Sequence, residues 1–188
     1  MEWGILFMGP VGAGKTQAVN TLSDIATADT EVAATDATAE LKEFTTVSMD
    51  AGVLDLGSGD KVRLIGAPGQ SRFDFMWDIL LEQAKAVVIL IDHSRESRYE
   101  DLSAYLDHVA QRSQGRKFPL AIGVTHADLI PDLSTSVYRD YLADRMPAFV
   151  RGVPPIFKVD ARQADDMRAL VIGVAAMLEM ESRFAAKA

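Results

Sequence analysis

One segment near the start of the chain limits the possible folds more than any other feature. Residues 9–16 read GPVGAGKT and match the pattern G-x-x-x-x-G-K-[ST] at every position. An apolar run at 3–8 precedes the segment, and apolar side chains recur at helical spacing over 15–26. A strand, a glycine-rich turn and a helix therefore follow one another. Glycines allow successive backbone N–H groups to point at one anion, so the segment predicts a phosphate-binding loop.

The loop assigns roles to its own side chains. Lys15 is expected to reach the β- and γ-phosphates of a nucleoside triphosphate, and Thr16 to bind Mg²⁺ through its hydroxyl. The helix that begins near Lys15 adds its dipole and its free N–H groups. The residues expected at the phosphates are Gly9, Val11, Gly12, Ala13, Gly14, Lys15, Thr16 and Gln17. The alternative is a glycine-rich turn with a solvated lysine, a chance match expected in roughly one chain in a hundred.

The rest of the chain alternates between strand-like and helix-like segments. Apolar runs predict further strands at 44–56, 61–66, 86–92, 120–125 and 155–159. A glycine-rich turn joins the first two of these strands as an antiparallel hairpin. Helical patterns separate the others, so the order predicts an α/β fold. We expect a mostly parallel six-stranded sheet with one antiparallel edge strand and helices on both faces, with ligands at the carboxyl ends of its strands.

Residues 27–43 differ from the rest of the chain. They are acidic, rich in Thr and Ala, and show no clear period. A loop of that length inside a compact domain is uncommon and is usually functional or mobile. We therefore interpret the segment as a long functional loop.

Composition limits the possible partners. The chain has 27 acidic and 19 basic residues and a net charge of −8, so no basic surface for nucleic acid or anionic lipid is expected. It contains no cysteine, which excludes disulfides. No apolar run approaches the ~18 residues that a membrane helix requires. We expect a soluble, cytoplasmic protein without an integral membrane segment, made of one domain over 1–188.

Three more motifs follow predicted strands, and they read GAPGQ at 66–70, THAD at 125–128 and VDAR at 159–162. With the phosphate-binding loop they make the chain resemble the Ras-like small P-loop GTPases over essentially its whole length. It looks most similar to the bacterial type related to the gliding-motility GTPases. The resemblance implies a P-loop NTPase fold, binding of GTP or GDP with Mg²⁺, and slow GTP hydrolysis by a molecular switch. It also implies switch loops at about 27–50 and 66–77, and a regulator of the roadblock type.

The resemblance assigns the residues around the γ-phosphate. Thr46 would bind Mg²⁺ and sense the γ-phosphate, and Gly69 would donate its N–H to that phosphate. Gln70 would orient the attacking water and would be the second catalytic residue beside Lys15. Plain readings exist for both stretches, namely a β-branched strand start at Thr46 and an ordinary Pro-Gly turn at 66–70.

Around the phosphates and the metal, the chain departs from the family at two positions. Gly66 stands where the family has an aspartate that holds Mg²⁺, and Asp50 or Asp92 could replace it, a choice that the sequence leaves open. Val11 stands where Ras relatives prefer glycine, and its bulk would obstruct the glutamine or an arginine finger. These departures support a second hypothesis, a nucleotide-dependent binding module with negligible hydrolysis. A P-loop ATPase or kinase is a third hypothesis.

The resemblance also assigns the base. Asp128 would accept both guanine N–H groups, which adenine lacks, and the Ala161 N–H would contact the guanine carbonyl, with Arg162 beside it. Thr125 and His126 replace the family's asparagine and lysine, and the imidazole could still cover the base. The plain reading of Asp128 is an acid that caps the next element.

Several other residues have two readings. Four large apolar side chains follow 66–70, namely Phe73, Phe75, Met76 and Trp77. Core packing is the default interpretation of this cluster, and a partner surface is the alternative. Arg72 is interpreted as a solvated charge rather than an arginine that moves to the γ-phosphate. His93 and His108 lack the spacing of metal ligands and are interpreted as surface polar residues.

Overall fold

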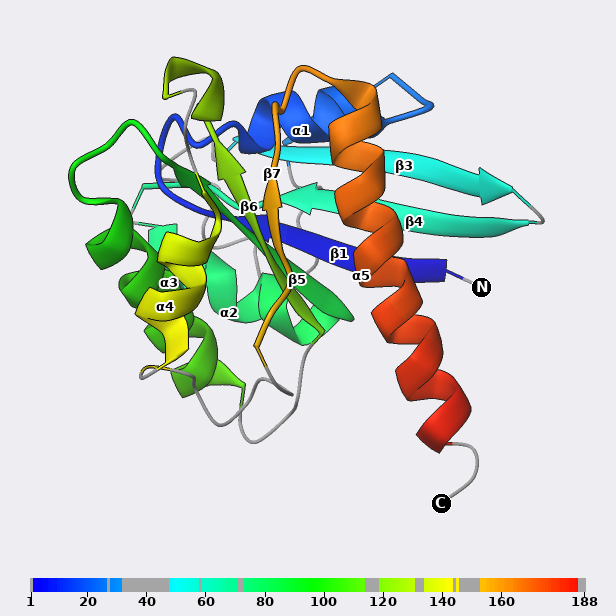
Figure 1. The fold of residues 1–188 in the computed structure, drawn as a ribbon. Helices are drawn as coiled ribbons and strands as arrows, with labels where there is room; N and C mark the ends of the chain where they lie inside the picture. The colour runs from blue at the N-terminus through cyan, green and yellow to red at the C-terminus, as the bar shows by residue number, and fades with distance from the viewer. Residues whose placement is uncertain are drawn as a thin grey trace.

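The computed structural model of the chain describes residues 2–26, 28–31, 48–57, 59–70, 73–113, 119–130, 134–143, 145 and 153–185. Within these ranges one seven-stranded sheet runs through the molecule in the order β2-β3-β4-β1-β5-β6-β7. Helices cover both of its faces (Figure 1). The α/β class and the mostly parallel sheet predicted from the sequence are therefore confirmed.

The strands are β1 (Glu2–Met8), β2 (Ala28–Glu31), β3 (Ser48–Gly57), β4 (Asp60–Gly66), β5 (Ala86–Asp92), β6 (Leu120–Thr125) and β7 (Ile156–Lys158). Neighbouring strands from β4 through β1, β5 and β6 to β7 are parallel. The central strands β1, β5 and β6 bury side chains on both faces, which explains their continuous apolar sequences.

The helices are α1 (Lys15–Leu22), α2 (Asp74–Gln83), α3 (Arg98–Arg112), α4 (Ser136–Ala143) and α5 (Ala164–Ala185), with a short 3-10 helix at Ala127–Leu129. Side chains of α2, α3 and α4 share one buried apolar cluster with the sheet. Side chains of α1 and α5 share a second cluster, so the two groups of helices lie on opposite faces. No helix in the described ranges has the length and apolar character needed to cross a membrane.

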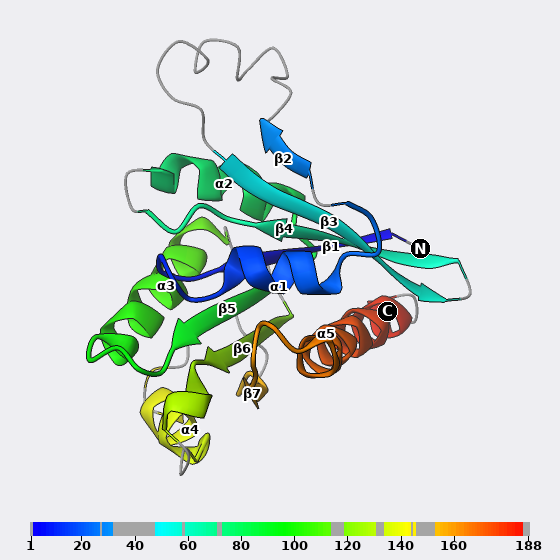
Figure 2. The ribbon, with the colours of Figure 1, turned by 90° about the horizontal axis from the view of Figure 1, so that it is seen from above.

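The sheet has one strand more than the six that the sequence predicts. β2 lies in the segment interpreted as a loop, and it pairs antiparallel with β3 at the edge of the sheet (Figure 2). Its sequence, ADTE, has no alternating pattern. An edge strand of this kind forms through backbone hydrogen bonds, which leave no periodic signal in the sequence. As a result the antiparallel strand, β3, lies inside the sheet and not at its edge.

Helix α1 ends four residues before the predicted end at 26. At Ser23 the backbone becomes extended. The Ser23 hydroxyl accepts a hydrogen bond from the Val53 N–H of β3 at 3.2 Å. The Asp24 N–H donates to the Val53 carbonyl at 2.8 Å, and its carboxylate accepts from the Asp55 N–H at 2.8 Å. These bonds to β3 replace the next helical turn. Ile25, which the helical spacing over 15–26 places on the apolar face, is exposed.

Candidate nucleotide-binding site

All the sequence motifs converge at one edge of the sheet, here called the carboxyl edge. The segment 9–16 follows β1, 66–70 follows β4, 125–128 follows β6 and 159–162 follows β7. Because these strands are parallel neighbours together with β5, their carboxyl ends lie side by side. This is the edge where open α/β sheets bind their ligands.

The phosphate-binding loop depends on glycine at its first position. Gly9 has a φ of +145°, which side chains of L-residues rarely allow. A Cβ at Gly9 would lie 2.2 Å from the Leu90 carbonyl oxygen of β5. The start of the loop, after β1, therefore packs directly against the backbone of β5. The end of the loop leads into the N-terminus of α1.

Lys15 is buried under the loop that it follows. Its Nζ donates to the Gly9 carbonyl at 2.7 Å and to the Pro10 carbonyl at 2.8 Å. An ammonium group has three protons, so one donor remains for a phosphate. Burial lowers the pKa of Lys15 to about 8, and the charge of Asp50 opposes that shift. The side chain is thus a positioned cation at neutral pH.

Thr16, Asp50 and Gly66 form a second local arrangement. The Thr16 hydroxyl donates to Asp50 Oδ2 at 2.5 Å. Asp50 in β3 is the cross-strand partner of Gly66 in β4. A Cβ at Gly66 would lie 3.0 Å from Asp50 Oδ2 and 3.1 Å from its Cβ. The Asp50 carboxylate therefore fills the space that a side chain at position 66 would otherwise occupy.

Asp92, the other candidate for this place, faces a different part of the site. Its Oδ1 accepts from the Ser94 N–H at 2.9 Å and from the Ser94 hydroxyl at 2.6 Å, and lies 3.3 Å from His126 Nδ1. Of the two carboxylates, Asp50 is the one in contact with Thr16. The described residues contain no cluster of three His, Cys, Asp or Glu side chains that could hold a metal. A hydroxyl and one carboxylate fit Mg²⁺, which usually takes few protein ligands and completes its shell with water and phosphate.

The segment after β4 packs directly on the phosphate-binding loop. A Cβ at Gly69 would lie 2.7 Å from Lys15 Nζ and 2.8 Å from Val11 N. Two aromatic side chains hold the segment there, because Trp77 Nε1 donates to the Pro68 carbonyl at 2.8 Å and the Tyr105 hydroxyl to the Gly69 carbonyl at 3.4 Å. Gly69 thus lies within reach of anything bound at the end of the loop.

The aromatic cluster after 66–70 divides into buried and exposed members. Trp77 and Phe73 belong to the core, and the Trp77 ring centroid lies 5.0 Å from that of Tyr105. Phe75 is 40% exposed, and Ile79 one turn later is also exposed. The default interpretation, core packing, is confirmed for Trp77 and Phe73, and the alternative remains open for Phe75.

Thr125 ties the end of β6 to the phosphate-binding loop. Its side chain is buried, and its hydroxyl lies 3.1 Å from the Ala13 carbonyl and 3.2 Å from the Ile91 carbonyl. A hydroxyl has one proton to share between these acceptors. The next residue, His126, has a φ of +55°, in the left-handed region that non-glycine residues seldom adopt. The chain therefore turns sharply between β6 and the short helix that carries Asp128.

Asp128 and the segment after β7 meet through Arg162. The Arg162 guanidinium lies 3.0 Å from Asp128 Oδ2 and 2.7 Å from Asp160 Oδ2. Its hydrogen bonds lower the pKa of Asp160. Ala161 lies against the phosphate-binding loop, since a Cβ at Gly14 would lie 3.0 Å from the Ala161 Cβ. The expected base-contacting residues are thus neighbours of the expected phosphate-contacting ones.

Comparisons with known proteins bear on the fold. No family model matches the chain. The solved G domain of the FeoB iron transporter of T. maritima superposes with a TM-score of 0.64, covering 93% of this chain and 99% of that one at 15% identity. The fold is that of a G domain. The uncharacterized protein MJ1339 of Methanocaldococcus jannaschii is 29% identical over 97 residues, which are 52% of this chain and 58% of that protein.

Thr46 and most of 27–43 lie outside the described residues, and so does Arg72. The other predicted site residues all lie at the carboxyl edge, and Gln70 is exposed there next to Gly69. Gly69 lies against Lys15 and Val11 at one part of this edge, and Arg162 ties Asp128 to the segment 159–162 at another part.

The prediction that His93 is a surface residue is wrong. Its side chain is buried, and its Nδ1 lies 2.7 Å from the Tyr138 hydroxyl of α4. Burial, followed by the charge of Arg98, lowers the pKa of His93, which favours the neutral ring. His108 is also mostly covered, with its ring centroid 4.5 Å from that of Trp77. Both histidines help the helices α2, α3 and α4 pack on their face of the sheet.

Sequence reasoning missed two polar side chains at the carboxyl edge. Arg95 comes three residues after β5, and its guanidinium reaches the Val11 carbonyl at 3.4 Å. Tyr105 lies on the buried stripe of α3 and looked like an ordinary core residue. For Arg95 a signal existed, because a charged residue just after a parallel strand lies where ligands bind. Tyr105 could be recognised only once α3 was placed against 66–70.

Proposed function

We propose that the chain binds guanine nucleotides with Mg²⁺ and hydrolyses GTP slowly, as a molecular switch. The observation that carries the proposal is Lys15, buried with two protons on loop carbonyls and one left for a phosphate, within reach of Gly69. The resemblance to the Ras-like GTPases of the gliding-motility type supports the choice of nucleotide. Hydrolysis then needs no covalent intermediate, since positioning and electrostatics supply the catalysis.

The metal site would use a carboxylate from a different strand than in the resembled family. When bound, Mg²⁺ would supply positive charge beside the phosphate oxygens. Thr16 would supply its hydroxyl, and Asp50 would stand in for the aspartate that Gly66 replaces. The contact between Thr16 and Asp50 supports this assignment, because both groups already face one point beside the loop. Thr46, as implied by the resemblance, would complete the protein ligands.

The base would be read at the other end of the site. Asp128 would accept the two N–H groups of guanine, and the Ala161 N–H would contact the guanine carbonyl. Arg162 holds one oxygen of Asp128, which fixes the carboxylate above 159–162. His126 would cover the ring, and Thr125 would act through the loop and not through the base, since its hydroxyl is occupied by backbone carbonyls.

The switch itself would consist of 27–50 and 66–77. A γ-phosphate would bind the Gly69 N–H and Thr46, and its loss would release both stretches. Gln70 would orient the attacking water. A roadblock-type regulator is a candidate partner for the exposed surface formed by Phe75 and Ile79. A nucleotide-dependent binding module with negligible hydrolysis is the second candidate, favoured by the bulk of Val11 at the mouth of the loop.

Nucleotide affinities test the proposal directly. The purified chain should bind GTP and GDP far more tightly than ATP and ADP, and GTP binding should weaken when Mg²⁺ is removed. Lys15→Ala should abolish GTP binding and turnover. Equal affinity for ATP and GTP would refute the guanine assignment, and a Lys15 variant with normal GTP affinity would refute the phosphate loop. Tight GTP binding without turnover would select the binding module.

A further inference from the structure

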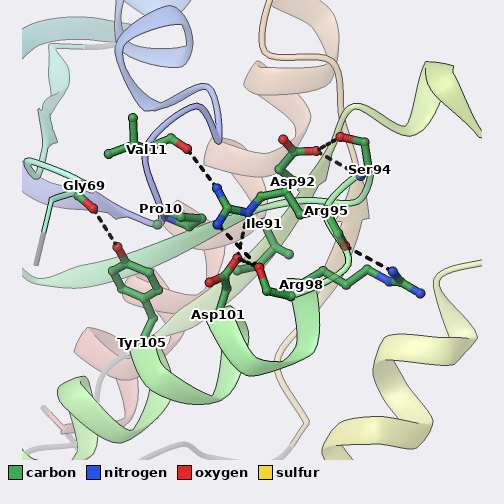
Figure 3. Close-up of polar contacts among 12 residues, drawn as sticks. Pro10, Val11, Gly69, Ile91, Asp92, Ser94, Arg95, Arg98, Asp101 and Tyr105 are labelled. Atoms are coloured by element: carbon green, nitrogen blue, oxygen red, sulfur yellow. Dashed lines mark hydrogen bonds and ion pairs between the residues drawn. The ribbon is translucent and has the colours of Figure 1, made fainter.

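Arg95 occupies a distinctive place beside the phosphate-binding loop. Figure 3 shows its guanidinium between the Val11 carbonyl and Asp101 of α3. Its Nε lies 3.0 Å from Asp101 Oδ2, while one terminal amino group lies 3.4 Å from the Val11 carbonyl oxygen and the other 3.4 Å from Ser97 Oγ. The shortest of these contacts is the ion pair at Nε, and the buried Nε–H has no hydrogen-bond partner among the described residues. Both terminal amino groups have contacts at the long limit for a hydrogen bond.

Val11 connects Arg95 to the groups expected around the γ-phosphate. Its carbonyl faces Arg95, and its nitrogen lies against Gly69. Lys15 Nζ also lies against Gly69, and the Tyr105 hydroxyl of α3 holds the Gly69 carbonyl. Arg95 and Gly69 thus both lie against Val11, and Gly69 also lies against Lys15 Nζ.

We propose that Arg95 is a catalytic arginine that this chain supplies to its own GTPase site. The inference rests on the proposed function. In the reaction, water attacks the γ-phosphorus, the bond from phosphorus to the β–γ bridging oxygen breaks, and the water proton ends on phosphate, giving GDP and inorganic phosphate. Arg95 neither gains nor loses a proton. Its terminal amino groups exchange the long contacts for charge-assisted bonds to phosphoryl oxygens as negative charge develops.

Asp101 is a positioning residue in this proposal. Its carboxylate pairs with Arg95 at Nε, one terminal amino group of Arg95 faces the Val11 carbonyl of the loop, and the other faces Ser97 Oγ. The Arg95 side chain is 40% exposed and can therefore rotate about this anchor without unpacking the core. Asp101 itself sits in the first turn of α3, where the helix dipole favours its charge.

A neighbouring arginine provides a matched control. Arg98 donates to the Arg95 carbonyl at 3.1 Å and lies over the Tyr99 ring, 4.8 Å from its centroid. It belongs to the same turn of chain and carries the same charge. Among the described residues, Arg98 contacts residues 95 and 99 rather than the phosphate-binding loop. The variant Arg98→Ala therefore removes one positive charge and one local contact from the same segment, and it leaves the proposed contact between Arg95 and the phosphates in place.

The experiment compares wild type, Arg95→Ala, Arg95→Lys, Asp101→Asn and Arg98→Ala. Three quantities are measured: single-turnover GTP hydrolysis, affinity for GDP and a non-hydrolysable GTP analogue, and capture of aluminium fluoride by the GDP complex. Aluminium fluoride reports on the transition state, because with GDP it mimics the phosphoryl group in transfer. Arg95→Ala should lower the hydrolysis rate roughly 10²-fold or more, lose aluminium fluoride capture and keep both affinities within about threefold.

The other variants separate a catalytic role from a structural one. Arg95→Lys should not restore the rate, because an ammonium cannot contact two oxygens as a guanidinium does. Asp101→Asn should lower the rate less than Arg95→Ala, and Arg98→Ala should match wild type. Hydrolysis by Arg95→Ala within twofold of wild type would overturn the inference alone. Equal losses in affinity and rate would also overturn it, in favour of a structural role. A wild-type chain that binds no guanine nucleotide would overturn the proposed function, and this inference with it.

Discussion

Moving the carboxylate from position 50 in β3 to position 66 in β4 tests the proposal that Asp50 helps to bind Mg²⁺. Asp50→Ala removes the acceptor of the Thr16 hydroxyl, and Gly66→Asp places a carboxylate on the partner strand at the same point. We expect Asp50→Ala to weaken Mg²⁺-dependent GTP binding, and the double variant Asp50→Ala/Gly66→Asp to regain most of it. Asp92→Asn serves as the control, since Asp92 faces Ser94 and His126.

The structure sets the size of each effect. Loss of one charge-assisted contact is worth about 1.5–3 kcal/mol, which is roughly a 10- to 150-fold loss of affinity. Gly66→Asp alone should also be harmful, because even its Cβ would lie 3.0 Å from Asp50 Oδ2. Two carboxylates about 4 Å apart repel by about 1 kcal/mol in water and about 4 kcal/mol near a protein surface.

The assay is a Mg²⁺ titration of the affinity for a fluorescent GTP analogue, with thermal unfolding of each variant as a check on folding. The decisive quantity is the ratio of affinities with and without Mg²⁺. If Asp50→Ala keeps the wild-type ratio while Asp92→Asn loses it, the assignment of the metal carboxylate is wrong. If the double variant folds but does not recover, position 66 does not share the site.

Three further predictions concern other parts of the molecule. Asp128→Asn should cost about 2–4 kcal/mol of GTP binding, roughly a 30- to 1,000-fold loss, and should raise the relative affinity for xanthine nucleotides in a calorimetric titration. Because the pKa of Lys15 is lowered to about 8, GTP affinity should fall as the pH rises above 8. The stability of the nucleotide-free chain should rise between pH 8 and about 10, because in that range the unfolded chain binds more protons than the folded chain. A GTP affinity that stays constant from pH 7 to 9.5 would contradict the first expectation. Trp77→Ala should lower the free energy of unfolding by about 3–5 kcal/mol, and Phe75→Ala by only a few tenths, in denaturant titrations.

The sequence predicts those strands whose side chains are buried on both faces. The bounds of β5 and β6 match the predictions at both ends, because continuous apolar runs end abruptly at Asp92 and Thr125. β2 was missed because backbone pairing at a sheet edge places no demand on side chains. His93 was misjudged because its partner, Tyr138, is 45 residues away and comes from α4.

For the site, the sequence predicted the residues that lie next to one another within a single motif. The segment 9–16 is such a group, and Lys15 Nζ bonds to the Gly9 and Pro10 carbonyls within it. The choice between Asp50 and Asp92 required the pairing register of β3 and β4, which places Asp50 opposite Gly66. That register is known only from the structure. Arg95 reaches the loop from the segment after β5, and Tyr105 reaches Gly69 through the packing of α3; for Tyr105 no spacing in the sequence records the contact.

The pairing of Asp50 with Gly66 also carries a consequence for how such chains change over evolution. The two positions share one space, so each constrains the size of the other. In related chains an acid at position 50 should accompany a small residue at position 66, and an acid at 66 should accompany a small or neutral residue at 50. Pattern searches that require the acid on the second of these strands will pass over chains that carry it on the first. The two positions should therefore covary as one unit.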